Sequence, residues 1–353
     1  MKLSKSSKMV LIVAFFPGSI RYEGIRRVAL SAYDRFANEK KKPTLLVPYK
    51  GDVPDSYSSF FLSENKGFSK IISALILYLR MLATIYKSKD LYDEFYCIES
   101  NPASAFTTIF LRLICRKQNS SVFFLSPIIE FNTFLKVFLT YKDFQMPLHY
   151  LFGNRLLAIF CRLFLSDTGR YYVGSDYQKE QLLKLGLDSK VIDTYGAVSP
   201  KSKNRKKSGP IIIGYLGHFS TIKGVDVLIS CFKEVLDLGF DVHLSIAWSG
   251  KGNCSDRISS LLSPDVFPSD RLTVTGIVEP ESFFQKIDLL VLPYLATSVP
   301  IPPAVLYEAV SSGTEVLIPD LPGLSGTLGK YCRFYKSESR LSLVNKIVDF
   351  LNE

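Results

Sequence analysis

The stretch PYLATSVPIPPAVLYEAVSSGTEVLI, residues 293–318, decides the fold more clearly than any other part of the chain. It begins where an apolar run of strand length, 287–292, ends, and it closes on a second such run, 315–318, with a helical segment between them. Strand, helix and strand in this order indicate a parallel α/β sheet, in which ligands bind beyond the carboxyl ends of the strands. Glu308 lies in that helix, so its carboxylate is placed to accept paired hydrogen bonds from neighbouring sugar hydroxyls, such as those of a ribose. A solvated glutamate on an amphipathic helix is the alternative interpretation.

The same alternation of strands and helices runs through both halves of the chain. Apolar runs of strand length lie at 9–16, 44–47, 95–98, 122–125 and 171–173, and again at 211–216, 242–247, 272–275, 287–292 and 315–318. Segments of helical period lie between them, at 25–38, 69–88 and 103–116 in the first half and at 225–236 in the second. Gly239 stands where the last of these would stop. The pattern predicts an α/β protein of two doubly wound halves.

Length and one basic segment divide the chain into domains. A chain of 353 residues is longer than a typical single core and fits two domains. Residues 200–210, PKSKNRKKSGP, contain no apolar residue, which favours a linker; a nuclear-localisation or nucleic-acid patch is the alternative. We expect an N-terminal domain at 1–200, a basic linker at 201–209 and a C-terminal domain at 210–353, whose last helix is free to pack back on the first domain.

Composition limits the partners and the compartment. A net charge of +10 favours an anionic partner, which can be a nucleotide phosphate, a nucleic acid or an acidic membrane surface. The cysteines are scattered without a CxxC pair, which argues against a zinc cluster and favours reduced thiols in a cytoplasmic protein. The apolar run at 9–16 follows lysines, as in a signal peptide, but it is short and lacks a cleavage pattern. We expect a buried strand there, and no transmembrane helix.

Residues 214–224, GYLGHFSTIKG, run from a strand through a loop into a helix and are a candidate phosphate-binding site. A helix N-terminus offers unpaired amides and a partial positive charge, and Lys223 stands beside it. A solvated helix cap is the alternative.

In their order, these segments resemble the group 1 glycosyltransferases, a GT4-like family of nucleotide-sugar enzymes. The resemblance is carried by YYVGSDYQKEQLLKLG at 171–186, GYLGHFSTIKGVDVLI at 214–229, LTVTGIVEPESF at 272–283, DLLVLPY at 288–294 and LYEAVSSGTEVLIP at 306–319. In the first half only FFPGSIRYEGIRRVAL, at 15–30, fits the family in outline. The resemblance implies the GT-B architecture, two facing Rossmann-like domains with a deep cleft between them.

Carried over by position, the resemblance assigns roles to individual residues. It implies that Glu308 holds the donor ribose and that Lys223 neutralises the donor diphosphate. The glycines that it places near the phosphates are Gly18, Gly24, Gly217 and Gly224. It places Ile277, Val278 and Glu281 near the nucleobase. It brings Ser298, Val299, Pro300, Ile301, Ala304 and Val305 to the transferred sugar.

The chain departs from the family pattern at three positions. His218 stands where the family usually has an arginine, and histidine is not permanently cationic. Pro300 stands where the family usually has a second glutamate, and proline offers neither a side-chain acceptor nor an amide donor. Ser126 and Pro127 follow the strand where many members place a histidine, which leaves Glu130 and Asn132 as the nearest polar candidates. A surface role for both is the alternative.

The resemblance implies retaining transfer of a sugar from a UDP- or GDP-linked donor to a hydroxyl acceptor, with no metal and no cofactor. We expect a glycan or lipid-linked acceptor in cell-surface polysaccharide or lipid-linked glycan synthesis. The expected location is the cytoplasm, with a possible peripheral position at the inner membrane face, because residues 131–165 combine apolar and basic side chains suited to an anionic surface. Helices packed in the domain core with basic edges are the alternative for this segment. An inactive relative that binds a nucleotide sugar or a partner is the alternative. A nucleic-acid partner is not expected, because no recognition motif for nucleic acid is visible.

Overall fold

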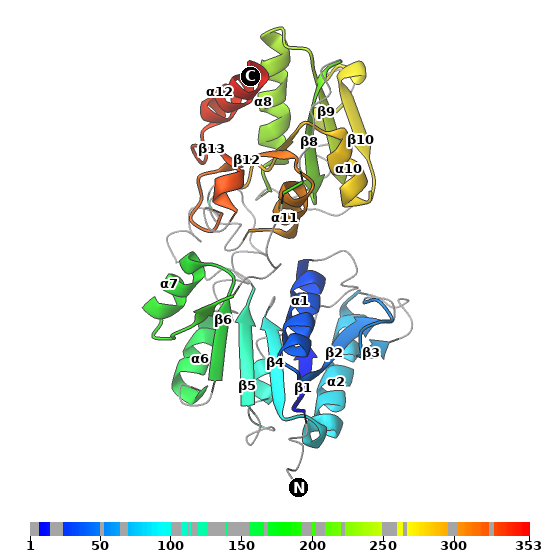
Figure 1. Ribbon diagram of the computed structural model, residues 1–353, viewed down its shortest axis with the longest axis vertical. Helices are drawn as coiled ribbons and strands as arrows, with labels where there is room; N and C mark the ends of the chain where they lie inside the picture. Colours follow the sequence, from blue (N-terminus) through cyan, green and yellow to red (C-terminus); the bar gives the residue numbers. More distant parts are fainter. Residues whose placement is uncertain are drawn as a thin grey trace. The chain divides into compact units, whose positions relative to one another are not determined.

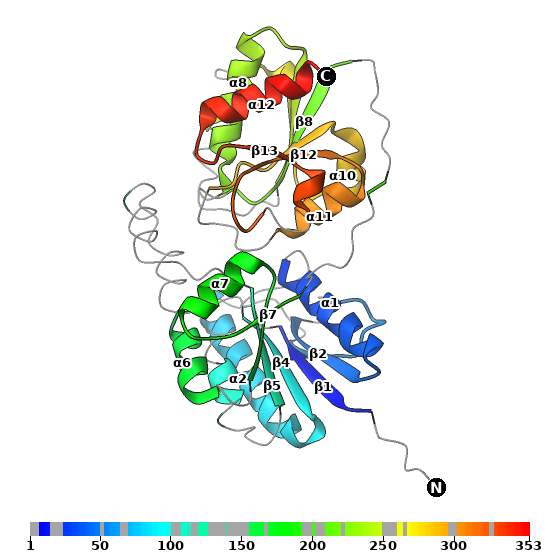
Figure 2. The same ribbon diagram turned by 60° about the vertical axis from the view of Figure 1, so that its left-hand side comes forward.

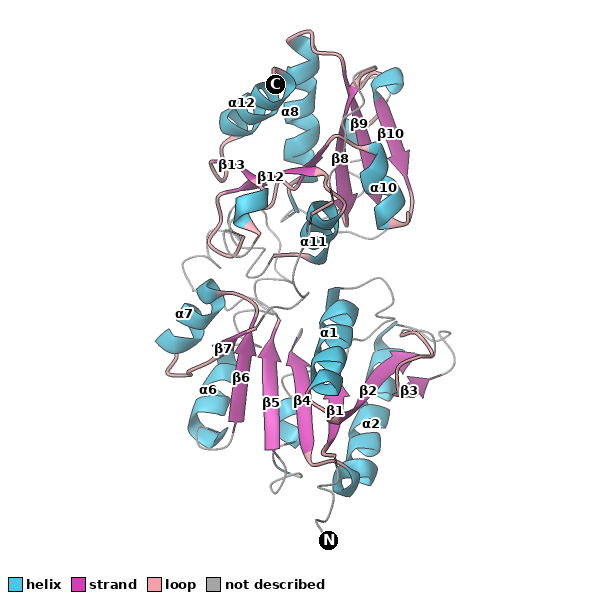
Figure 3. Ribbon diagram, in the orientation of Figure 1, coloured by secondary structure: helices cyan, strands magenta, loops and turns pink. Residues whose placement is uncertain are grey.

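The protein forms two compact units, Met1–Gly196 and Ala197–Glu353, each built on one parallel sheet (Figure 1). The computed structural model describes residues 7–14, 24–49, 53–63, 70–99, 107–111, 113, 119–125, 139, 155–165, 169–192, 200–201, 209–219, 223–248, 260–263, 267–295, 302–324 and 328–353. Figure 3 shows the alternation of strands and helices within each unit.

In the N-terminal unit, the described strands form a seven-stranded sheet in the order β3-β2-β1-β4-β5-β6-β7, and all neighbours are parallel. The strands are β1 (Met9–Val13), β2 (Lys42–Tyr49), β3 (Ser59–Ser63), β4 (Glu94–Glu99), β5 (Asn119–Phe124), β6 (Gly169–Val173) and β7 (Lys190–Val191). The helices are α1 (Gly24–Asn38), α2 (Lys70–Ser88), α6 (Arg155–Leu165) and α7 (Asp176–Lys184), with a short 3-10 helix at Lys89–Leu91. Residues 107–111 and 113 are also helical.

Helices cover both faces of this sheet, because alternate residues of each strand point to opposite sides. Val10 and Ile12 of β1 pack with α1, whereas Leu11 and Val13 pack with α2. Val122 of β5 packs with α6, and its partner in β4, Cys97, packs with α2. Paired residues of neighbouring strands point to the same side, so α2 and α6 cover the same face of the sheet. Figure 2 shows α2 and α6 on one side of the sheet and α1 on the other.

In the C-terminal unit, the described strands form a six-stranded sheet in the order β10-β9-β8-β11-β12-β13, again parallel throughout. The strands are β8 (Ile211–Gly217), β9 (Val242–Trp248), β10 (Leu272–Thr275), β11 (Leu289–Val291), β12 (Glu315–Pro319) and β13 (Arg333–Tyr335). The helices are α8 (Val225–Asp237), α10 (Pro280–Lys286), α11 (Ala304–Ser311) and α12 (Arg340–Leu351), with 3-10 turns at Ser269–Arg271 and Gly329–Tyr331. Helix α12 packs beside α8 and shares its core cluster (Figure 2).

The predicted fold class is confirmed: both units are parallel α/β sheets of the doubly wound kind. Each strand expected from an apolar run has its counterpart, and α8 buries the predicted face and stops before Gly239, whose φ is 86°. Three edge strands were missed: β7 and β13 have only two and three residues, and β3, SFFLS, has only three apolar residues between two serines.

Candidate functional site

The strand order of the C-terminal sheet reverses between β8 and β11. Strands β9 and β10 continue outward from β8, and β12 and β13 continue outward from β11. Because β8 and β11 are parallel neighbours, their carboxyl ends lie at the same edge of the sheet. In open α/β sheets, this reversal opens the crevice in which ligands bind. The residues that follow β8 and β11 therefore define the candidate site.

Gly224 brings the segments after β8 and β11 into direct contact. It precedes α8 with a left-handed φ of 64°, and a Cβ built on it would lie 2.0 Å from the carbonyl oxygen of Pro293. Any side chain would strain the backbone and collide with that oxygen, so the position requires glycine. The turn before α8 consequently packs directly on the backbone that follows β11.

Lys223 is a desolvated cation at this contact. Its ammonium nitrogen lies 4.1 Å from the centroid of the Tyr294 ring, in a cation–π arrangement. Among the residues that the structure describes, it has no hydrogen-bonded or ion-paired acidic partner. Desolvation lowers the pKa of Lys223 from 10.5 to about 8. A cation held in this way is ready to accept an anion, and such perturbed groups gather at functional sites.

His218 and Gly217 form the exit from β8. The hydroxyl of Tyr215 donates a hydrogen bond of 2.9 Å to the carbonyl oxygen of His218, which fixes this peptide at the end of the strand. The His218 residue itself is partly buried. Gly217 ends β8 and His218 follows it, whereas Lys223 and Gly224 directly precede α8.

Glu308 lies in the middle of α11, the helix that follows β11. The residues Leu306, Tyr307, Ala309 and Val310 of this helix are buried, whereas Glu308 is only partly buried. Ala304 and Val305 form the first turn, so their amides are among those that a helix N-terminus leaves free for a ligand. Pro302 and Pro303 precede them and carry no amide hydrogen.

The residues predicted near a nucleobase follow β10, farther along the same sheet edge. Ile277 is 61% exposed and Val278 is partly buried. Glu281 lies in the first turn of α10, and its carboxylate pairs with the ammonium of Lys201 at 3.0 Å, where both side chains are exposed. An exposed pair of this kind contributes little stability.

Several predicted residues lie outside the described residues: Gly18, Glu130, Ser298, Val299, Pro300 and Ile301. Gly24 is described and is the first residue of α1, in the N-terminal unit. Gly24 therefore lies between β1 and the body of α1.

Two features of the site were missed by the sequence reasoning. Tyr294, the ring beneath Lys223, was treated as part of a strand motif, although an aromatic residue directly after a buried strand is a usable signal. Phe219 and Trp248 stack with centroids 4.4 Å apart and an interplanar angle of 4° at the carboxyl ends of β8 and β9. Trp248 is the single tryptophan of the chain, so its fluorescence reports on this edge.

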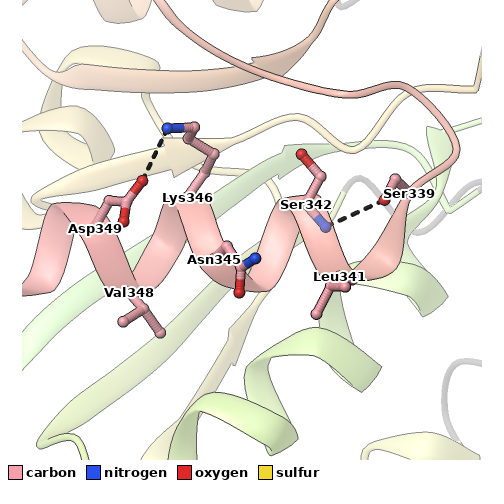
Figure 4. A pocket seen from close by; sticks show the side chains of 7 residues that line it. All are labelled: Ser339, Leu341, Ser342, Asn345, Lys346, Val348 and Asp349. Atoms are coloured by element: carbon pink, nitrogen blue, oxygen red, sulfur yellow. Dashed lines mark hydrogen bonds and ion pairs between the residues drawn. The ribbon is translucent and has the colours of Figure 1, made fainter.

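A surface depression of about 460 Å³ lies elsewhere, on the outer side of α12 (Figure 4). Its lining residues are Ser339, Leu341, Ser342, Asn345, Lys346, Val348 and Asp349, none of them a predicted site residue. Within the described part of the chain, no three His, Cys, Asp or Glu side chains are grouped so that they could hold a metal ion. No described helix is both long and apolar enough to cross a membrane.

Comparison with solved structures defines the class of the fold. A glycosyltransferase from Rickettsia africae superimposes with a TM-score of 0.63 at 12% identity, over 98% of this chain and 88% of that one. HepE from Anabaena, in complex with UDP-glucose, gives 0.62 at 14% identity over 98% and 90%. A mutant of S. aureus TarM, solved with UDP, gives 0.67 at 11% identity over 98% and 93%. The fold is that of the GT-B glycosyltransferases, with two Rossmann-like domains.

The family follows from the sequence of the second domain. Residues 210–353, the C-terminal domain, match the family described as Glycosyl transferases group 1. For this domain the predicted family is confirmed. No curated protein sequence is significantly similar to the chain.

Proposed function

We propose that this protein is a retaining glycosyltransferase that moves a sugar from a UDP- or GDP-linked donor to a hydroxyl group. The observation that carries the proposal is the desolvated Lys223 ammonium at the strand reversal, which has no acidic partner among the described residues. A buried cation is costly unless an anion accompanies it. In a group 1 domain, the diphosphate of a nucleotide sugar is the anion that fits. HepE and TarM were solved with UDP-glucose and UDP, which supports a UDP-linked donor.

In this proposal, negative charge gathers on the leaving diphosphate as the glycosidic bond breaks. Lys223 and the amides at the start of α8 stabilise that charge, with His218 as a further hydrogen-bond donor. The charge is neutralised without a metal ion or a cofactor. Glu308 accepts hydrogen bonds from the ribose, and the amides of Ala304 and Val305 face the transferred sugar.

The acceptor belongs to the first domain. We assign residues 1–200 to the acceptor domain, 201–209 to a linker and 210–353 to the donor domain. The acceptor that suits the basic first half is a lipid-linked glycan or a polysaccharide precursor at the cytoplasmic face of a membrane.

A catalytically inactive relative is the second candidate, and one observation favours it. Pro302 and Pro303 remove two amide hydrogens directly before α11, so the described part of this helix entrance offers fewer donors to a sugar than a glycine-rich segment would. Such a relative would still bind a nucleotide sugar through Lys223 and Glu308, and it would not transfer the sugar.

Binding and turnover separate the candidates. UDP, GDP and UMP are titrated against Trp248 fluorescence and thermal unfolding, since a ligand that binds only the folded state raises the melting temperature. We expect a nucleoside diphosphate to bind at least about tenfold more tightly than UMP, because Lys223 faces the second phosphate. Lys223→Ala is expected to remove this preference, with Lys233→Ala, an exposed lysine of α8, as the control. Donor consumption supports the transferase, and binding without turnover supports the inactive relative. Equal affinity of wild type and Lys223→Ala for UDP would contradict both.

A further inference from the structure

One layer of helices on the N-terminal sheet is apolar on its outer side. Helices α2 and α6 and the helical residues 107–113, where described, cover the same face of the sheet. Their outward side chains include large apolar residues with exposures between 38% and 66%: Ile76, Leu79, Tyr86, Leu113, Ile159 and Leu163. We call this set the apolar layer. Single exposed leucines are ordinary, but a set gathered on one face indicates an interaction surface.

Helix α2 carries large apolar side chains on its exposed side as well as on its buried side. Its inner side packs Leu77, Met81 and Ile85 into the core, each at most 2% exposed. Its outer side presents Leu79 and Tyr86 at 56% and 55% exposure. A helix with large apolar side chains on two opposite sides normally has a partner on each of them.

The charged residues of α2 and α6 are all basic, and the turn that follows α2 carries one exposed acidic residue, Asp90. The sequence of α2 contains Lys70, Arg80 and Lys87 and no acidic residue, and that of α6 contains Arg155 and Arg162 and no acidic residue. The unit as a whole follows the same trend. Residues 1–196 contain 27 Lys and Arg against 17 Asp and Glu, whereas residues 197–353 contain 16 of each. The whole net charge of the chain therefore belongs to the unit that carries the apolar layer.

We propose that the apolar layer docks on an anionic lipid bilayer, with its apolar side chains at the boundary between headgroups and acyl chains and its cations on the lipid phosphates. Apolar side chains interleaved with Lys and Arg are what interfacial helices use for this purpose. A second copy of the chain is a poorer occupant, because two such surfaces would bring cations against cations. The inference extends the proposed function by naming the surface that brings the enzyme to a lipid-linked acceptor.

Vesicle binding of the full-length protein tests the docking surface. Wild type is sedimented with vesicles of phosphatidylglycerol and phosphatidylcholine and with vesicles of phosphatidylcholine alone. We expect binding to the anionic vesicles that weakens about tenfold or more in the double variant Leu79→Gln and Leu163→Gln, because two large apolar contacts with lipid are lost. The matched control is Leu238→Gln with Leu341→Gln, two leucines of the C-terminal unit with 62% and 69% exposure, which should bind as wild type does.

The charge contribution is measured separately with Lys87→Gln and Arg162→Gln. Each is expected to weaken binding to anionic vesicles about fivefold, because one cation near such a surface contributes about that much. Both positions are exposed, so folding should be preserved. Fluorescence titration of UDP against Trp248 in the same samples separates the two proposals, since the docking variants should keep the wild-type affinity for UDP.

Two outcomes would overturn the inference. One is equal vesicle binding by wild type and by the Leu79 and Leu163 variant. The other is a dimer in solution that dissociates in this variant while wild type ignores vesicles, which would assign the apolar layer to self-association. Loss of UDP binding in the wild-type protein would instead contradict the proposed function and leave the docking result standing.

Discussion

Replacing Lys223 by methionine should make the protein more stable and a weaker nucleotide binder. Desolvation lowers the pKa of Lys223 from 10.5 to about 8, and each pKa unit corresponds to about 1.4 kcal/mol, so the charged form costs the folded state about 3 kcal/mol. Methionine fills a similar volume without a charge. We therefore expect Lys223→Met to raise the free energy of unfolding by about 3 kcal/mol at pH 7.

The stability difference between Lys223→Met and wild type depends on pH. The folded-state pKa lies below the unfolded one, so between about pH 8 and pH 10.5 the unfolded chain holds the proton that the folded chain has lost. The penalty of Lys223 is fully present below pH 8 and disappears as the pH rises to 10.5. The stability difference between Lys223→Met and wild type should therefore shrink by about 1.4 kcal/mol per pH unit in this window.

Urea unfolding at pH 7, 9 and 10 measures the stability difference, and Trp248 fluorescence measures UDP affinity at pH 7. Lys233→Met, which removes an exposed lysine of α8, should change stability by less than about 0.5 kcal/mol. Lys223→Met should bind UDP about 10- to 100-fold more weakly, because a charge-assisted hydrogen bond to phosphate is lost. A variant that is less stable than wild type at pH 7, or that binds UDP equally well, would refute the reasoning.

Three further predictions concern the same site. Gly224→Ala should destabilise the protein by about 3 kcal/mol or more in urea unfolding, because its Cβ would meet the Pro293 carbonyl oxygen. The control Gly239→Ala, at φ 86° with no atom within 4 Å of its Cβ, should cost about 1 kcal/mol. Equal costs would refute the close contact. Tyr294→Leu should weaken UDP binding about fivefold while Tyr294→Phe stays near wild type, since only the leucine removes the ring beneath the ammonium; a phenylalanine variant as weak as the leucine one would assign the effect to the hydroxyl. UDP affinity, measured by fluorescence, should fall as the pH rises above about 8 because Lys223 loses its charge, and in Lys223→Met this decline should be absent.

The sequence predicted the sheets well because buried parallel strands are continuous apolar runs. Strands such as β8, β9 and β12 stand out against the polar segments around them. The missed strands have different causes. Strand β13, RFY, lies at a sheet edge and carries a charged residue, and β7 has only two residues, so neither produces a pattern that differs from a loop. Pairing with a neighbouring strand, which the sequence does not display, is what makes these residues strands.

The candidate site was predictable to the extent that its residues are close in sequence. His218, Lys223 and Gly224 lie on one loop, so one motif identifies them together. The contact of Gly224 with Pro293 joins segments that lie far apart in the chain, and it depends on the strand order, which brings β11 beside β8. The ring of Tyr294 beneath Lys223 is a consequence of that contact. Sequence reasoning named Lys223 and Glu308 as candidates, and only the structure shows that Tyr294 lies against Lys223.

The division of charge between the units changes how the composition is understood. The net charge of +10, taken over the whole chain, favours any anionic partner, including a nucleotide phosphate. Residues 197–353, which contain the candidate donor site, hold equal numbers of acidic and basic residues, so no broad positive field of this unit explains attraction of a diphosphate. The proposed function therefore assigns donor affinity to the local, desolvated charge of Lys223, whose interaction salt screens only weakly. The excess of cations belongs to the N-terminal unit, where the apolar layer offers a surface on which an anionic bilayer would use them.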